Sequence, residues 1–157
     1  MKKIENEMFK RVDNSALIVF RIFFGLLVAF ECWGAIFTGW VSQILVEPEH
    51  TFHFIGLDFL QPLPGNGMFF YYLIMGLLGV FIMIGFYYNW SISAFTLLWT
   101  ATYLMQKSAY NNHYYLLILI SIFMIIVPAH KFLSYDTRKR NIEENHSMPN
   151  WVNLFII

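Results

Sequence analysis

The sequence is poor in charge and in cysteine. Only 13% of its 157 residues are Asp, Glu, Lys or Arg, and residues 59–106 contain none; a soluble domain carries about 25%. Ten acidic residues balance ten basic ones, so there is no polybasic surface to attract nucleic acid. The single cysteine, Cys32, excludes an intrachain disulfide and a thiolate metal cluster. These absences exclude a soluble enzyme, a disordered tail and a nucleic-acid-binding protein.

Hydrophobic residues make up 58% of the chain and aromatic residues 20%. A helix that crosses a bilayer needs about 20 mostly apolar residues, and four stretches come close to this requirement. The second and third are so near each other that they must form a tight hairpin around residues 87–91. The sequence therefore predicts an all-α polytopic membrane protein, a single transmembrane domain over 1–157, with membrane-spanning helices over about 15–37, 68–86, 87–105 and 113–129.

A fifth apolar run follows Pro149-Asn150 and covers 151–157. Eight helical residues from Asn150 extend only about 12 Å, too short to cross. We expect this run to be the truncated start of a fifth helix.

Lys and Arg predict the orientation of the helices in the membrane. The segments before the first and after the fourth predicted helix each carry four of them, whereas loop 38–66 has none and loop 106–112 has only Lys107. We therefore expect both termini in the cytoplasm and loops 38–66 and 106–112 on the outer side, in the inner or plasma membrane if the source is bacterial. The leader mixes acids with bases, which favours an uncleaved first helix over a signal peptide.

Two charged residues, Arg21 and Glu31, lie inside the first predicted span. Ten helical residues separate them by about 15 Å in height, so they cannot pair within one helix. Each needs a partner on another helix or water. Interfacial snorkelling with an interhelical hydrogen bond, and a functional role, both remain open.

Loop 38–66 contains His50 and His53 beside Glu47 and Glu49. Two histidines at this spacing could bind a metal on one helical turn. No further ligands are evident, and Pro48 favours irregular structure, so we predict no metal site.

The densest polar cluster covers residues 106–115, QKSAYNNHYY. The cluster combines a lysine, amides, an imidazole and phenols at the predicted depth where water gives way to the membrane interior. The lower dielectric constant there strengthens hydrogen bonds to a bound anion or carbonyl. The alternative is an interfacial aromatic belt with helix-capping Asn residues. His130, Ser134 and Asp136 are predicted to be cap and interface residues.

Five motifs in order resemble the vitamin K-dependent γ-glutamyl carboxylase family and its bacterial relatives, the horizontally transferred transmembrane (HTTM) domain proteins. The resemblance covers nearly the whole chain. Its motifs are Phe20-Arg21-Ile22-Phe23-Phe24-Gly25, Gln61-Pro62-Leu63-Pro64, Lys107-Ser108-Ala109-Tyr110-Asn111-Asn112-His113, the pair Pro128-Ala129-His130 and Ser134-Tyr135-Asp136, and Pro149-Asn150-Trp151.

The resemblance implies chemistry on reduced vitamin K or a related quinol. In the family, hydroquinone epoxidation drives carboxylation of a peptide glutamate. By position, Asn112 and His113 match the pair that hydrogen-bonds the cofactor and the reacting oxygens. Lys107 and Tyr110 belong to the same motif and are expected to contribute to cofactor binding.

The sequence also departs from the family. The family's catalytic lysine lies on the next helix, beyond Ile157, so the resemblance implies that the base is absent. Gln106 stands where many members have Asp. We therefore expect the N-terminal part of a carboxylase-like protein, inactive alone, whose partners are lipids, a quinol and a polypeptide that supplies the missing helices.

Two other functions remain open. One is a quinone-binding accessory membrane protein of the DoxX-like kind, without carbon dioxide chemistry. The other is a structural membrane subunit that docks onto a second polypeptide.

Overall fold

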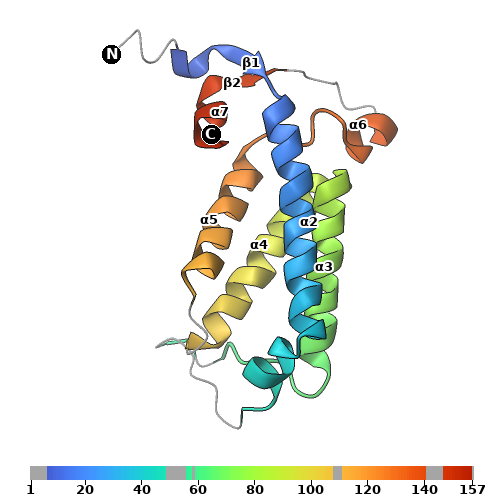
Figure 1. Cartoon of the computed structure of the whole chain (residues 1–157), viewed down its shortest axis with the longest axis vertical. Coiled ribbons are helices and arrows are strands. Elements are labelled where there is room, and N and C mark those ends of the chain that lie inside the picture. The colour runs from blue at the N-terminus through green and yellow to red at the C-terminus, as the bar shows by residue number, and fades with distance from the viewer. Residues whose placement is uncertain (1–6, 49–55, 58, 108–110, 141–146, 157) are drawn as a thin grey trace.

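The computed structural model describes residues 7–48, 56–57, 59–107, 111–140 and 147–156. Most of them are helical, which confirms the prediction of a mainly helical fold. Four long helices lie side by side along the molecule (Figure 1). They are α2 (Ser15–Phe37), α3 (Gly67–Ile84), α4 (Tyr88–Met105) and α5 (Asn112–Ile126).

Shorter elements close the two ends of this bundle. At one end, β1 (Arg11–Asp13) pairs antiparallel with β2 (Ser147–Pro149), and α6 (Tyr135–Arg140) and α7 (Asn150–Ile156) lie beside the pair (Figure 1). At the other end, α2 continues into the short π-helix η1 (Ser42–Val46). The strand pair departs from the all-helical prediction, because strands of three residues carry no readable alternation. The described parts of the N- and C-terminal segments thus meet at one end of the bundle.

The helix α5 is shorter than the sequence predicts. We expected it to reach about residue 129, but it ends at Ile126, and Val127 is extended with φ −86° and ψ 142°. Val127 precedes Pro128, whose ring disfavours helical geometry in the residue before it.

A tight turn joins α3 to α4, slightly before the position predicted. Gly85 ends α3 in the left-handed conformation at φ 69°, and Tyr87 is also left-handed at φ 43°. The amides of Gly85 and Phe86 bond back to Ile82 and Phe81, as in a glycine-capped helix end. Glycine is required at position 85 for two reasons: the backbone is left-handed there, and a Cβ would clash with Ser134.

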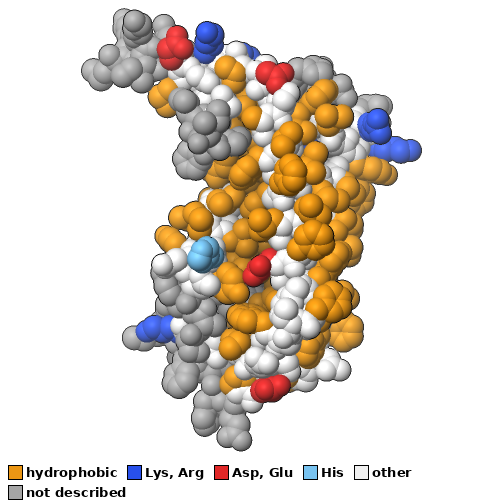
Figure 2. Space-filling view, in the orientation of Figure 1, with side chains coloured by type: hydrophobic (Ala, Val, Ile, Leu, Met, Phe, Trp, Pro, Cys, Tyr) orange, Lys and Arg blue, Asp and Glu red, His pale blue; other side chains and the backbone are white. Residues whose placement is uncertain are grey.

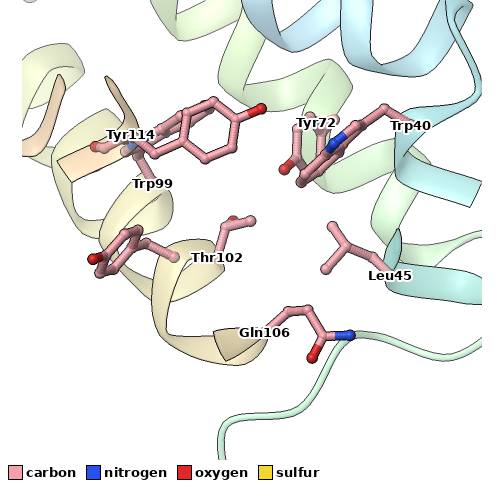
Figure 3. A pocket seen from close by; sticks show the side chains of 8 residues that line it. Trp40, Leu45, Tyr72, Trp99, Thr102, Gln106 and Tyr114 are labelled. Atoms are coloured by element: carbon pink, nitrogen blue, oxygen red, sulfur yellow. Dashed lines mark hydrogen bonds between the residues drawn. The ribbon is translucent and has the colours of Figure 1, made fainter. Parts of the chain in front are cut away.

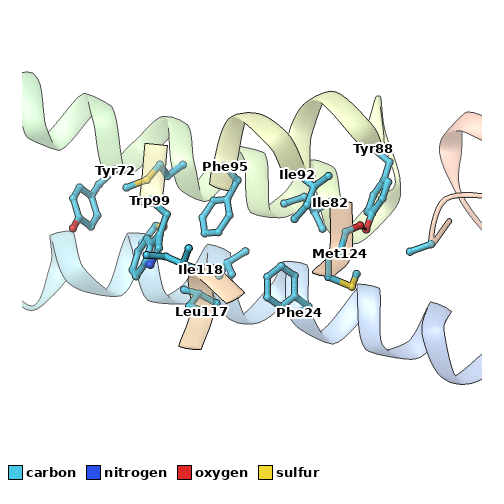
Figure 4. Packing of buried hydrophobic residues seen from close by; sticks show 14 of the residues in the cluster. Phe24, Tyr72, Ile82, Tyr88, Ile92, Phe95, Trp99, Leu117, Ile118 and Met124 are labelled. Atoms are coloured by element: carbon cyan, nitrogen blue, oxygen red, sulfur yellow. Dashed lines mark hydrogen bonds between the residues drawn. The ribbon is translucent and has the colours of Figure 1, made fainter. Parts of the chain in front are cut away.

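Aromatic and aliphatic side chains fill the space between the helices (Figure 4). Equally large hydrophobic side chains point outward: Phe23, Phe70, Leu97 and Ile126 are each 64–69% exposed. Figure 2 shows hydrophobic side chains over the middle of one face and Lys or Arg towards its ends. Contiguous exposed apolar surface of this kind marks a membrane or protein interface.

Among the described residues, α2 and α3 are the two helices long and apolar enough to cross a membrane. The helix α4 has sufficient length, with 18 residues, but a lower apolar content, and α5 has 15 residues.

The helices α2 and α3 approach closely because small residues face each other. A Cβ on Gly25 would lie 2.7 Å from the carbonyl oxygen of Gly79, and one on Gly79 would lie 2.8 Å from the amide nitrogen of Ala29. Small residues at such a contact let two backbones pack directly, which is a main source of helix association in membranes.

We predict that Gly25→Ala destabilises the protein by about 1–3 kcal/mol, because the added methyl group must displace α3. Gly34→Ala is the matched control, since Gly34 lies in the same helix and a Cβ there meets nothing within 4 Å. It should be neutral or slightly stabilising through higher helix propensity. Unfolding of both variants in detergent measures the difference, and equal stability would contradict this packing.

Candidate functional site

The polar cluster predicted at residues 106–115 includes the first turn of α5. The Asn111 side chain caps this helix, because its Oδ1 accepts the backbone N–H of His113 at 2.9 Å. The same oxygen lies 2.8 Å from Nδ1 of the His113 ring. The helix-capping Asn that the sequence allowed is therefore present, and it also holds the His113 ring.

This contact determines which nitrogen of a neutral His113 carries the proton. The Asn111 atom is an acceptor, since it already receives a backbone N–H. The facing Nδ1 must then be the donor, which leaves the lone pair on Nε2. Since the His113 side chain is exposed, Nε2 can accept a hydrogen bond from a bound hydroxyl.

The other predicted site residues are less closely associated. Asn112 is exposed beside His113, and Lys107 is exposed just after α4. Tyr110 lies outside the described residues, as do His50, His53 and Glu49 of loop 38–66. Among the described residues, no group of three or more His, Cys, Asp or Glu side chains is placed to hold a metal.

A large apolar groove of about 720 Å³ runs along α5, bordered by Phe20 of α2 and Trp151 of α7. Its α5 lining is Leu116, Leu119, Ile120, Ile122, Phe123 and Ile126. His113 precedes Leu116 and Ile120 by three and seven residues, so all three lie on one face of the helix. The groove thus begins about one helical turn from the imidazole.

The groove and the first turn of α5 together fit an amphipathic aromatic ligand. The volume falls within the roughly 300–1,000 Å³ of small-molecule sites. The imidazole and amides of His113 and Asn112 offer hydrogen bonds at one end, and the apolar walls suit a hydrocarbon chain. A quinol has both parts, so the residues present fit the cofactor that the resemblance implies.

The side chain that follows His113 points into the bundle. Tyr114 packs edge-on against Trp40 and Trp99, with ring centroids 5.9 and 5.3 Å apart. Its hydroxyl also interacts with the carboxylate of Glu31 on α2. Glu31 therefore has a partner on another helix, one of the two alternatives that the sequence left open.

Arg21, the other charge inside the first helix, is buried and only 1% exposed. Its Nη1 donates to the carbonyls of Ala129 at 2.7 Å and Phe132 at 3.3 Å, and its Nη2 donates to that of Leu133 at 2.7 Å. The guanidinium thus finds its partners in backbone carbonyls of the segment after α5, and the interfacial snorkelling that the sequence left open is wrong because the side chain is buried.

Asp136 binds backbone groups at the N-terminus of α4. Its two carboxylate oxygens accept the backbone N–H groups of Tyr87 at 3.0 Å and Tyr88 at 2.9 Å. A carboxylate at a helix N-terminus satisfies donors that have no partner within the helix. This bears out the interpretation of Asp136 as a cap residue, although it caps a helix that begins 48 residues earlier.

His130 completes this end of the bundle by stacking on Tyr88, with ring centroids 5.5 Å apart. The hydroxyl of Tyr88 donates to the Met124 carbonyl at 2.8 Å. Burial lowers the pKa of His130 below its ordinary value, while the Asp136 carboxylate acts in the opposite direction. The imidazole is therefore held mainly as a neutral packing group.

We predict that Arg21→Met destabilises the protein by about 2–5 kcal/mol, because three carbonyls lose their donor. Arg11→Met is the matched control, since Arg11 is exposed on β1 and donates to the Ser147 hydroxyl. It should change stability little. Thermal unfolding in nanodiscs compares the two variants, and a small effect of Arg21→Met would show that the segment after α5 is held by other contacts.

The sequence allowed a helix-capping Asn in the cluster without assigning it to Asn111, and it did not single out Tyr72, Trp40 or Trp99. Asn111 carried a readable signal, an Asn directly before an apolar run. Tyr72 lies on α3, Trp99 on α4 and Trp40 between α2 and η1, and only the fold brings them together.

The comparisons with known proteins identify the family of the chain. The HTTM domain family model matches residues 9–157. No solved structure matches the chain. Since the family match spans nearly every residue, the chain belongs to the HTTM domain family.

Proposed function

We propose that this chain is an integral membrane protein in which α2, α3, α4 and α5 all cross the bilayer. The helices α2 and α3 meet the length and hydropathy that crossing requires, and α4 and α5 lie beside them at the same level (Figure 1). Outward-facing Leu97 on α4 and Ile126 on α5 are 69% and 68% exposed. Such side chains suit lipid better than water.

The proposed orientation places both termini in the cytoplasm. The β1–β2 pair brings the two terminal segments to one end of the bundle, as an even number of crossings requires. Lys10, Arg11, Arg138 and Lys139 are exposed at that end, and excess Lys and Arg favour the cytoplasmic side.

Within this bundle, the α5 face is proposed to bind a reduced quinone. The observation that carries this proposal is the position of His113, which keeps an acceptor at Nε2 and lies about one helical turn before Leu116, the first groove-lining residue of α5. The quinol hydroxyl would donate to His113 Nε2, and the exposed amide of Asn112 would bond the same ring. The apolar chain of the quinol would lie against Leu116, Ile120 and Phe123.

When bound, a reduced quinone supplies the electrons for reaction with oxygen. By membership of the family, the reaction proposed here is quinol epoxidation coupled to carboxylation of a peptide glutamate. The part of this chain's own residues is to hold and orient the ring, to accept a hydrogen bond or a proton at His113 Nε2, and to exclude water with the groove walls.

A second candidate function is quinone binding without carbon dioxide chemistry. It is favoured by the exposure of Asn112 and His113, and of Lys107 just before them, because the carboxylation chemistry needs a site sheltered from water. Incubation with quinol, oxygen, labelled bicarbonate and a glutamate peptide tests for carboxylation. Label in the peptide would show carboxylation and contradict the expectation that the chain is inactive alone. Quinol binding without label is the result that both this expectation and the second candidate give.

We predict that His113→Ala weakens quinol binding about two- to tenfold in lipid nanodiscs, the effect of losing one hydrogen bond. Tyr115→Ala is the matched control, since Tyr115 is 49% exposed near the same helix end but is not among the groove-lining residues. Equilibrium binding of a quinol with an isoprenoid chain measures both.

The groove provides an independent test of the same site. Ile120→Trp should obstruct the groove and weaken a long-chain quinol more than a chainless one, whereas His113→Ala should weaken both equally. Equal binding of both quinols by all variants would contradict the proposed site.

A further inference from the structure

A small cavity lies inside the bundle, on the core side of α5, between α4 and the end of α2 (Figure 3). Its volume is about 20 Å³, slightly more than the roughly 10–15 Å³ that one water-sized sphere needs. Aromatic rings form most of its wall, where Trp40 lies between Tyr72 and Tyr114 at centroid distances of 6.1 and 5.9 Å. The cavity has room for one water molecule, and neither a quinol nor a peptide side chain can enter it.

The Tyr72 hydroxyl is a buried donor that needs an acceptor. The Tyr72 side chain is 2% exposed and lines the cavity, and its hydroxyl points towards the open space in Figure 3. Among the described residues, this hydroxyl has no hydrogen-bond partner. A buried donor without an acceptor destabilises a fold, so an acceptor in the cavity would stabilise this one.

The cavity wall also offers acceptors from two other helices. The Thr102 hydroxyl of α4 donates to the Leu98 carbonyl at 3.1 Å, and the Tyr114 hydroxyl of α5 interacts with the Glu31 carboxylate. A hydroxyl that donates still carries lone pairs on its oxygen, so both oxygens can accept from a guest. A buried water typically makes two to four hydrogen bonds, and one donor with two acceptors meets this requirement.

Polar contacts matter at this end of α5 because the helix has one main packing partner. Among the described elements, α5 packs chiefly against α4, and the apolar groove borders both α5 and Phe20 of α2. The contact of Tyr114 with Glu31 links the first turn of α5 to α2. A water between the hydroxyls of Tyr72 and Tyr114 would add a link to α3.

We propose that this cavity binds one water molecule, which accepts from the Tyr72 hydroxyl and donates to the hydroxyl oxygens of Tyr114 and Thr102. The water joins α3, α4 and α5 at one point, and the contact of Tyr114 with Glu31 extends this joint to α2. The joint fixes the first turn of α5, which carries His113. Its effect on quinol binding rests on the proposed function, whereas the water site does not.

Infrared spectra of the protein in nanodiscs, prepared in ordinary water and in ¹⁸O-labelled water, test for the bound molecule. A buried water gives a narrow O–H stretching band that shifts with the oxygen isotope, whereas Tyr and Thr hydroxyls keep their own oxygen. Tyr72→Phe, which removes only the hydroxyl, should abolish this band. Tyr71→Phe is the matched control and should keep it, because the Tyr71 hydroxyl donates to Leu98 at 2.7 Å and Tyr71 does not line the cavity.

The direction of the stability change gives an independent readout. With the water bound, Tyr72→Phe removes a hydrogen bond, and the unfolding temperature in nanodiscs should fall by about 2–4 °C. In a dry cavity the same change would remove an unsatisfied donor, and the unfolding temperature would stay constant or rise. Tyr71→Phe shows the fall that the loss of one direct hydrogen bond produces.

Hydrogen exchange tests the role of the water at α5. The backbone amides of residues 116–118 bond to the carbonyls of the first turn of this helix. Tyr72→Phe should speed their exchange about two- to tenfold, without a matching change in the middle of α3. The control variant Tyr71→Phe should leave the exchange of these α5 amides unchanged.

An isotope-sensitive band that is lost in Tyr72→Phe, together with a lower unfolding temperature and faster exchange in α5, supports the proposal. The absence of the band from folded wild-type protein, its persistence in Tyr72→Phe, or unchanged exchange in α5 overturns it. If Tyr72→Phe fails to fold, Thr102→Val decides, because it removes one acceptor and should shift the band.

Quinol binding is measured in the same nanodiscs. Protein that holds the water and binds no quinol would contradict only the proposed function. Protein that binds quinol without holding the water would contradict only this inference.

Discussion

The guanidinium of Arg21 is the contact on which one whole end of the fold depends. Its hydrogen bonds to Ala129, Phe132 and Leu133 anchor the segment after α5 to α2. That anchored segment places Asp136 against the N-terminus of α4 and brings Ser134 beside Gly85. Pro128 prevents this segment from continuing as a helix, so its carbonyls have no helical hydrogen-bond donors. Buried backbone groups need hydrogen-bond partners in a low-dielectric interior, and the buried Arg21 donates to three of these carbonyls.

The two ends of the bundle have different roles. At the Arg21 end, charges and hydrogen bonds close the structure, and His130 is held against Tyr88 as a packing group. At the opposite end, the first turn of α5 leaves His113 exposed with a defined acceptor nitrogen. An apolar groove and an aromatic-walled cavity flank that turn. The Arg21 end therefore holds the segment that follows α5, while the candidate site residues Asn112 and His113 lie where α5 begins.

Long apolar runs made the helices predictable from the sequence. The expected bounds of 15–37 and 87–105 lie within one residue of α2 and α4, and the Asn cap of α5 was visible as a local pattern. The rest depends on contacts between distant residues. Three features bring together segments that are distant in the chain. They are the β1–β2 pair, the capping of α4 by Asp136, and the cavity that Tyr72 lines with residues of other elements. The candidate site residues could thus be proposed from the sequence, but the orientation of the His113 ring and the existence of the cavity could not.

The central claim is that four helices cross the membrane with both termini on one side. The single native cysteine, Cys32, is fully buried, so cysteines introduced one at a time can be labelled selectively with a membrane-impermeant maleimide. The account predicts that Lys10→Cys, Asn89→Cys and Lys139→Cys react from one side of sealed vesicles, and Asn66→Cys and Lys107→Cys only from the other. Labelling of Asn66→Cys or Lys107→Cys from the same side as Lys10→Cys would contradict it.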